Sequence, residues 1–332
     1  MQILGFSQRE STSLESLTDD VQMSSEIEGE HLDRLQVRSS LARRLGIDVG
    51  AFAPVDRQIE GVVEMILDAT TRFDAPLTAE RLFGWHSCLF PSGRSGMWRI
   101  RVGAWREDHN GPMQVVSGGI GSERVHYEAP AASALETEMA SFLEWFEKSG
   151  DVDPVLKAAL AHLWFVMIHP FEDGNGRIAR AIADLALARS ESSGQRYYSM
   201  SAQILKEKNA YYDVLENSGK ATMDVTLWIT WFLSCLDRAI AGAEATIDQV
   251  VAKSRFWDRA ANLEINERQR LMLNKLLDGF EGKLTTAKWS KIAKCSHDTA
   301  LRDIQDLIGK DVLQMDQAGG RSSSYLLNHG LG

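Results

Sequence analysis

The chain has 332 residues, 44% of them hydrophobic, which is enough for a sizeable core and for more than one domain. Its net charge of −10 argues against nonspecific nucleic-acid binding by the body of the chain, and its three widely spaced cysteines exclude a disulfide framework. No apolar run reaches membrane length and no signal-peptide pattern is present, so we expect a cytoplasmic protein that does not enter a membrane.

The first predicted element is a helix from Leu14 to Leu32, where apolar residues recur at helical spacing. Ser24 and Glu28 are four residues apart, so both side chains would share one face, with the hydroxyl orienting the carboxylate. The same spacing occurs by chance in many helices, where the glutamate is usually solvated. The chain starts abruptly at Met1, which leaves open whether the native N-terminus extends further.

The next informative element is a predicted β-hairpin. Residues 113–117 and 123–127 are short and rich in residues typical of strands, and Gly118–Gly121 between them is typical of a hairpin loop. An ordinary surface hairpin is the simpler alternative to a functional one.

A helix, a tight loop and a second helix follow. Pro154–Ile168 is almost wholly apolar, and Ile178–Arg189 is rich in alanine and leucine. The turn Gly174-Asn175-Gly176 leads into the second helix. Free N–H groups and the helix dipole favour an anion at such an N-terminus, above all a phosphate.

The side chains of this loop fit phosphate chemistry. Arg177 and Arg180 are three residues apart on one helical face, which suits two phosphates rather than one. Asp173 is a hard oxygen ligand suited to Mg²⁺, and His169 is the natural general base because it titrates near neutrality. A lone histidine beside a proline is usually structural, but all these groups in one short segment favour function.

The C-terminal part, residues 255–332, differs from the rest in charge and pattern. It carries 12 basic and 10 acidic residues, a net charge of +2, against −12 for the remainder. Residues 289–294 and 296–308 resemble a helix-turn-helix, and 309–315 and 323–327, bridged by Gly319-Gly320-Arg321, resemble a wing. The predicted second helix contains three acidic residues that would repel phosphate, Asp298, Asp303 and Asp306. DNA binding by this winged helix is therefore not favoured over packing, dimerisation or protein contact.

The segment His169–Arg180 resembles the signature of the Fic family, His-Pro-Phe-x-Asp/Glu-Gly-Asn-Gly-Arg-x-x-Arg, at every fixed position. The resemblance implies a mainly α fold, a helical Fic-type bundle with a small β-hairpin flap. We accordingly expect an N-terminal helical region at 1–60 with an inhibitory helix, a Fic catalytic domain at 61–250 and a winged helix-turn-helix domain at 255–332.

The resemblance also implies an activity, the transfer of AMP from ATP to a hydroxyl of a target protein. His169 would deprotonate that hydroxyl, and Asp173 would hold Mg²⁺ between the α- and β-phosphates. Arg177 would hold the β-phosphate and Arg180 the γ-phosphate. The loop Gly174, Asn175 and Gly176 would cradle the phosphates, with the Asn175 side chain stabilising charge and Phe171 as a packing anchor.

Ser24, Glu28 and Gly29 resemble the inhibitory motif of the same family, Ser/Thr-x-x-x-Glu-Gly/Asn. Glu28 would pair with Arg180, so that ATP binds in a pose unsuited to in-line attack. In some members the resemblance also allows this glutamate to position water for the removal of AMP.

Further expectations follow from the resemblance. The target protein would dock on the flap at 113–127, and a homodimer would couple to inhibition. Tyr211, Tyr212 or Asn209 would contact the base of the nucleotide. The alternative function is a nucleotide-sensing regulator that binds DNA through the winged helix. An intact His169 favours the enzyme, because a sensor needs no base.

Overall fold

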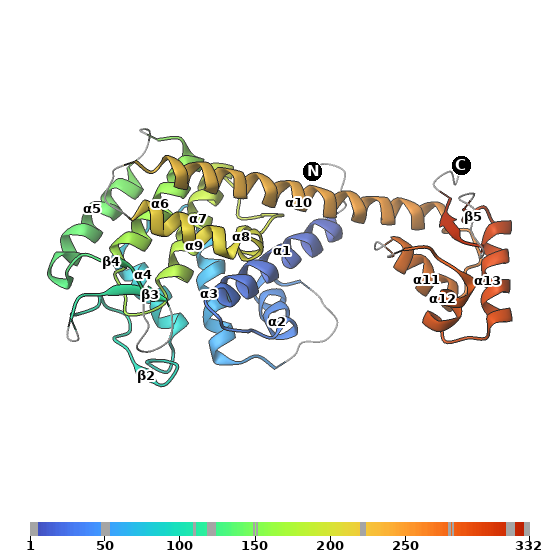
Figure 1. Ribbon diagram of the computed structural model, residues 1–332, viewed down its shortest axis with the longest axis horizontal. Coiled ribbons are helices and arrows are strands. Elements are labelled where there is room, and N and C mark those ends of the chain that lie inside the picture. The colour runs from blue at the N-terminus through green and yellow to red at the C-terminus, as the bar shows by residue number, and fades with distance from the viewer. Residues whose placement is uncertain are drawn as a thin grey trace. The chain divides into compact units, whose positions relative to one another are not determined.

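The protein is described by a computed structural model over residues 6–47, 54–108, 111–117, 124–148, 150, 152–219, 224–277, 280, 282–316 and 323–328. The chain divides into two compact units between Ala243 and Glu244. The fold is mainly α, as the sequence predicts (Figure 1). None of the described helices has the length and apolarity needed to cross a membrane.

The first unit is a bundle of helices with two small hairpins. Its helices are α1 (Phe6–Ile27), α2 (Arg34–Leu45), α3 (Arg57–Thr71), α4 (Ala79–Leu89), α5 (Leu135–Glu147) with the preceding 3-10 turn η1 (Ala132–Ala134), α6 (Pro154–Ile168), α7 (Asn175–Glu191), α8 (Met200–Lys206) and α9 (Lys208–Ser218). Helix α10 (Thr226–Arg259) begins in this unit and ends in the second.

Helix α7 is the centre of this bundle, since every side chain from Arg177 to Ala188 is buried. It packs against α6, α3 and α4, while α1 packs mainly on α8 (Figure 1). Helix α6 begins where Asp153 accepts hydrogen bonds from two backbone N–H groups and Pro154 occupies the first turn. The loop between α6 and α7 is therefore fixed at both ends by buried helices.

The two hairpins of this unit are antiparallel. Strand β1 (Arg94–Ser95) pairs with β2 (Trp98–Arg99). Strand β3 (Gln114–Ser117) pairs with β4 (Arg124–Glu128), with Gln114 opposite Glu128 and a register shift after Val115. These are the strands predicted at 113–117 and 123–127; the predicted loop Gly118–Gly121 lies outside the described residues.

The second unit contains the helices α11 (Glu267–Leu277), α12 (Thr286–Ile292) and α13 (His297–Gly309) and the paired strands β5 (Leu313–Met315) and β6 (Tyr325–Leu327). Its core includes Met272, Trp289 and Ile304, all fully buried. Helices α12 and α13 occupy the segments predicted as a helix-turn-helix, with α12 starting three residues earlier. The predicted bridge Gly319–Arg321 lies outside the described residues.

Two of the three acidic residues in α13 do not lie as expected. Asp303 is buried and bonds to Arg268 at 2.9 Å, and Asp306 accepts hydrogen bonds from Gln269 and Lys310. Both carboxylates have a cationic partner within the unit, which offsets part of the repulsion expected from Asp303 and Asp306. Asp298 is exposed, and of the three it alone has no cationic neighbour among the described residues.

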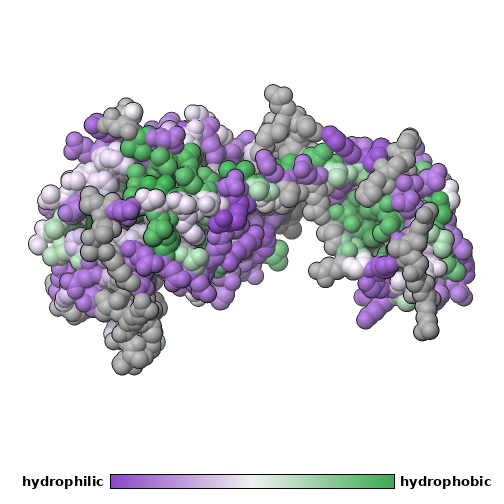
Figure 2. All heavy atoms as spheres, turned by 45° about the horizontal axis from the view of Figure 1, so that its top comes forward, coloured by the Kyte–Doolittle hydropathy of each residue, from purple (hydrophilic) through white to green (hydrophobic). Residues whose placement is uncertain are grey.

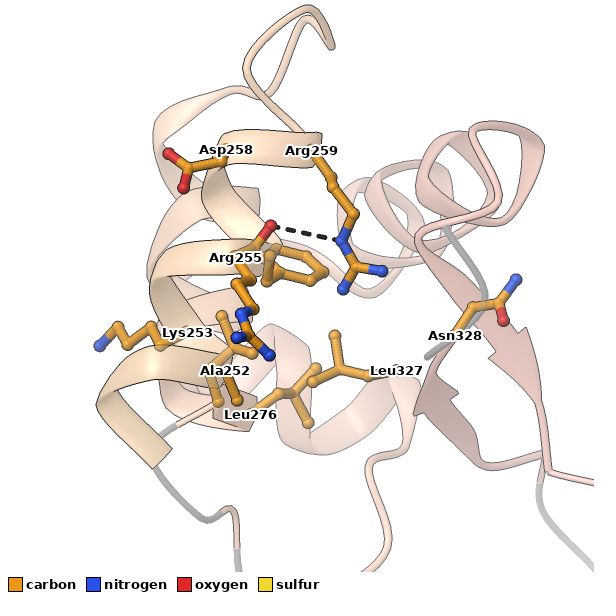
Figure 3. A pocket seen from close by; sticks show the side chains of 10 residues that line it. Ala252, Lys253, Arg255, Asp258, Arg259, Leu276, Leu327 and Asn328 are labelled. Atoms are coloured by element: carbon orange, nitrogen blue, oxygen red, sulfur yellow. Dashed lines mark hydrogen bonds between the residues drawn. The ribbon is translucent and has the colours of Figure 1, made fainter. Parts of the chain in front are cut away.

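A cavity of about 630 Å³ lies within the second unit, lined by apolar side chains that include Phe256, Leu276 and Leu327. The side chains of Arg255 and Arg259 point into it (Figure 3). Apolar side chains also gather among hydrophilic ones on the visible surface of each unit (Figure 2).

Candidate functional site

His169 ends α6 in a left-handed conformation, with φ of 50°. Its ring Nδ1 lies 3.2 Å from the carbonyl oxygen of Val166. Since that carbonyl can only accept, Nδ1 carries the proton and Nε2 keeps its lone pair. Burial lowers the pKa of His169, an effect that the Val166 contact opposes. The ring is therefore held neutral, in the tautomer that a general base requires.

Arg106 holds the backbone at His169 and at the next residue, Pro170. Its Nε donates to the carbonyl of His169 at 2.8 Å, and its backbone N–H donates to the carbonyl of Pro170 at 2.9 Å. Asp108 pairs with the guanidinium at 2.6 Å, so this buried charge is compensated. Arg106 is 63 residues before His169, and no pattern in the sequence points to it.

Asn175 is clamped to Phe171 rather than exposed to a ligand. Its Oδ1 accepts from the N–H of Phe171 at 3.0 Å, and its Nδ2 donates to the carbonyl of Phe171 at 2.8 Å. Asn175 is 2% exposed and Phe171 is fully buried. Each of these atoms makes one hydrogen bond here, and Oδ1 keeps a second lone pair and Nδ2 a second N–H, so the phosphate-binding role of the Asn175 side chain stays a prediction.

His86 supports the loop from α4, which the sequence did not reveal. Its ring stacks on Phe171 with centroids 4.2 Å apart. Nδ1 accepts from Gly103 N–H at 3.1 Å, so Nε2 carries the proton and donates to the carbonyl of Asp173 at 3.2 Å. Burial lowers the pKa of His86 to about 4, which keeps this bridge uncharged at neutral pH.

Asp173 lies where the loop meets α7. One carboxylate oxygen accepts from the N–H of Gly174 at 2.6 Å, and the other accepts from the hydroxyl of Ser95 on β1. No group of three or more possible metal ligands occurs in the part of the chain that is described. A single half-buried carboxylate fits a Mg²⁺ ion that takes its other ligands from phosphates and water.

Arg177 and Arg180 are nearly fully buried, at 1% and 2% exposure. Arg180 NH2 donates to Glu28 at 2.8 Å and to the carbonyl of Ser24 at 2.8 Å. Arg177 NH1 donates to Glu30 at 2.6 Å. Arg177 Nε and Arg180 NH1 are buried without a hydrogen-bond partner among the described residues.

Glu28 reaches the start of α7. A Cβ placed on Gly176 would collide with its Oε1, so the carboxylate lies directly against the backbone where a helix N-terminus attracts anions. Burial alone would lower the pKa of Arg180, but Glu28 reverses this and the net shift is upward. The Glu28 carboxylate thus occupies the anion position of the loop.

The relation of Ser24 to Glu28 differs from the prediction. Helix α1 ends at Ile27, and Glu28 lies in the turn beyond it, so the two residues do not share a helical face. The Ser24 hydroxyl accepts from Arg180 Nε at 2.9 Å instead of orienting the carboxylate. Gly29 has φ of 84°, a conformation that glycine adopts without strain as the chain leaves the helix.

The two tyrosines predicted near the base differ in position. Tyr211 is 2% exposed and its hydroxyl lies 2.9 Å from His162 Nε2. It also packs near Trp231, so it belongs to the aromatic core. Tyr212 is 42% exposed and donates to the carbonyl of Ile27 at 3.2 Å. Of the two tyrosines, Tyr212 is the one whose side chain is exposed enough for a ligand to contact it.

Comparison with known proteins connects this geometry to a family. Residues 76–187 match the Fic/DOC family, and residues 1–47 match a domain of unknown function, DUF4172. A "Protein adenylyltransferase Fic" of Nematostella vectensis is 31% identical over 113 residues, 33% of this chain and 25% of that protein. A "Protein adenylyltransferase fic-1" of Caenorhabditis briggsae is 42% identical over 55 residues, 16% of this chain and 11% of that protein. The chain thus spans a quarter or less of the length of these curated relatives.

Solved structures share the fold. A Fic family protein from Desulfovibrio desulfuricans is similar over 99% of this chain and 90% of its own, with a TM-score of 0.54 at 20% identity. A Fic domain containing signaling protein from Bacteroides thetaiotaomicron covers 70% of this chain and 87% of its own, with a TM-score of 0.52 at 24% identity.

Proposed function

We propose that this chain, whose residues 76–187 form a Fic/DOC-family domain, is a protein adenylyltransferase. It would transfer AMP from ATP to a hydroxyl side chain of a target protein. The observation that carries the proposal is the single loop that joins a neutral imidazole at the end of α6 to two buried arginines at the start of α7. Proteins called adenylyltransferases are among the relatives of this chain.

The proposed reaction follows from the positions of these groups. Nε2 of His169 accepts the proton of the target hydroxyl as its oxygen attacks the α-phosphorus. The new bond joins that oxygen to phosphorus, and the bond from the α-phosphorus to the bridging oxygen breaks, releasing pyrophosphate. Positioning and charge neutralisation supply most of the rate in such transfers.

The other loop residues hold the donor. The loop Gly174–Gly176 would cradle the phosphates, Arg177 would bind the β-phosphate and Arg180 would bind the γ-phosphate. Asp173 would hold Mg²⁺, which when bound neutralises charge on the phosphates. Phe171, Asn175 and His86 act as positioning residues, because they fix the loop through packing and backbone hydrogen bonds.

The proposed resting state is inactive. Arg180 cannot hold a γ-phosphate while it is bound to Glu28 and Ser24. Glu28 would also position water for the removal of AMP, once the turn that carries it has moved.

The flap, formed by β3 and β4, is the proposed docking edge for the target, which would add a strand to it. Tyr127 of β4 donates its hydroxyl hydrogen to the carbonyl of Met167 in α6, at 2.8 Å. A target strand on this hairpin would therefore be held close to His169, two residues further along the chain.

A second candidate function is a nucleotide-sensing regulator that binds DNA. The neutralisation of Asp303 and Asp306 within the second unit favours it more than the sequence did. A gel-shift titration over salt tests it: binding through phosphate contacts weakens steeply as salt rises, and no binding at low salt would eliminate this candidate.

The enzyme is tested by incubation with ATP labelled at the α-phosphate and Mg²⁺, using wild type, Glu28→Gly and His169→Ala. We expect label on the protein or on lysate proteins to be strongest in Glu28→Gly and absent in His169→Ala. Arg180→Ala added to Glu28→Gly should abolish it again. No label in Glu28→Gly with any of several nucleotides would refute the adenylyltransferase.

A further inference from the structure

Arg177, like Arg180, has a carboxylate partner, and the sequence did not suggest it. Glu30 Oε2 lies 2.6 Å from Arg177 NH1. Glu28 and Glu30 are two residues apart, on the same turn after α1, and they face two arginines that are three residues apart on α7. The closed site therefore contains two matched ion pairs.

We propose that Glu30 is a second inhibitory residue, which together with Glu28 occupies the places of two adjacent phosphates. The turn then competes with both phosphates of the diphosphate part of a nucleotide, instead of only misplacing its last phosphate. This inference rests on the proposed function, since it assigns Arg177 and Arg180 to the β- and γ-phosphates.

The burial of Arg177 makes this contact strong. The side chain is almost fully buried, and its guanidinium lies 5.1 Å from the centre of the Phe90 ring. A buried charge needs a partner, because removal from water is costly. With Glu30 in place, an incoming phosphate must displace a charge-assisted hydrogen bond. Without Glu30, the same guanidinium is uncompensated and attracts the phosphate more strongly.

The two carboxylates are built to move together. The N–H groups of Glu28 and Glu30 both donate to the carbonyl of Ser25, at 3.1 and 3.0 Å. Gly29 between them has the left-handed conformation that closes this turn. Gln58 on α3 donates to Glu30 at 3.3 Å. A signal that loosens the turn would free both arginines at once.

The chemistry of the ligand follows from this pairing. A ligand with two adjacent phosphates, such as ADP or inorganic pyrophosphate, competes with both carboxylates. AMP has only one phosphate and does not reach both arginines. The affinity gained on removal of Glu30 should therefore depend on the number of phosphates and be independent of the base.

Calorimetric titration of the full chain with Mg²⁺ and ADP, inorganic pyrophosphate or AMP tests this. Glu30→Gln should tighten binding of ADP and pyrophosphate about tenfold or more, as expected for loss of one competing charged hydrogen bond, and leave AMP unchanged. The matched control is Glu26→Gln, since Glu26 lies on the same segment but near His31 instead of an arginine. A thermal melt of a second variant, Glu30→Ala, shows whether a substitution at this position changes binding only because the protein misfolds.

Equal affinities for ADP in Glu30→Gln and Glu26→Gln would overturn the proposal, as would an equal gain for AMP. If Glu30→Gln bound ADP more tightly but Glu28→Gly showed no transfer activity, the inhibitory role of Glu30 would stand and the adenylyltransferase would be refuted. If Glu28→Gly showed transfer activity but Glu30→Gln did not change the binding of ADP, the adenylyltransferase would stand and the inhibitory role of Glu30 would be refuted.

Discussion

At the scale of single residues, the two hydrogen bonds between the Asn175 side chain and the backbone of Phe171 fix the conformation of the loop. In Asn175→Ala the buried N–H and carbonyl of Phe171 lose their partners, so we expect the free energy of unfolding to fall by about 2 kcal/mol or more. Urea unfolding measures this. Unchanged stability with weaker binding of pyrophosphate would instead assign the amide to the phosphates.

The sequence predicted the part of the site that is local in the chain. His169, Arg177 and Arg180 lie within one loop and one helical turn, so spacing alone was enough to group them. His86 and Arg106 escaped prediction because their partners are 87 and 63 residues away. Glu30 was missed for the same reason: its distance from Arg177 depends on how α1 packs.

At the scale of elements, Asp20 is the buried link between α1 and α8. Its Oδ1 accepts from the Ser199 hydroxyl at 2.5 Å, and Arg196 lies 3.8 Å from Oδ2. Burial, with the nearby Asp184 carboxylate, raises the pKa of Asp20 to about 7. The folded protein therefore binds a proton that the unfolded chain releases near its ordinary pKa of about 4.

The sign of the effect on stability follows from this shift. The contribution of Asp20 is fully present below its unfolded pKa and is lost as pH rises through about 7. In urea unfolding, we expect the stability that Asp20→Asn gains over wild type to be larger at about pH 8 than at about pH 5, because the asparagine stays neutral while wild type loses stability as pH rises from about 4 to about 7. The same difference at both pH values would show that Asp20 does not titrate during unfolding.

The elements themselves were largely predictable, and their ends were not. Apolar runs located α6 and α7, and strand-forming residues located β3 and β4. The break at Glu207 between α8 and α9 was not predicted. The end of α1 at Ile27 was also missed, because apolar spacing continues to Leu32 while the backbone turns at Gly29.

At the scale of the whole molecule, the chain forms two hydrophobic cores that share no residue. One contains residues between Leu14 and Ala239, and the other contains residues between Phe256 and Tyr325. Each core is expected to unfold as its own cooperative unit, because loss of packing in one leaves the contacts within the other intact.

Calorimetry of matched variants tests this independence. Trp289 is fully buried in one core and Phe142 in the other, and truncation of either to alanine costs about 3–5 kcal/mol. We expect two transitions, with Trp289→Ala lowering the midpoint of one by ten degrees or so and Phe142→Ala lowering only the other. If either substitution moved both transitions equally, the cores would be energetically coupled.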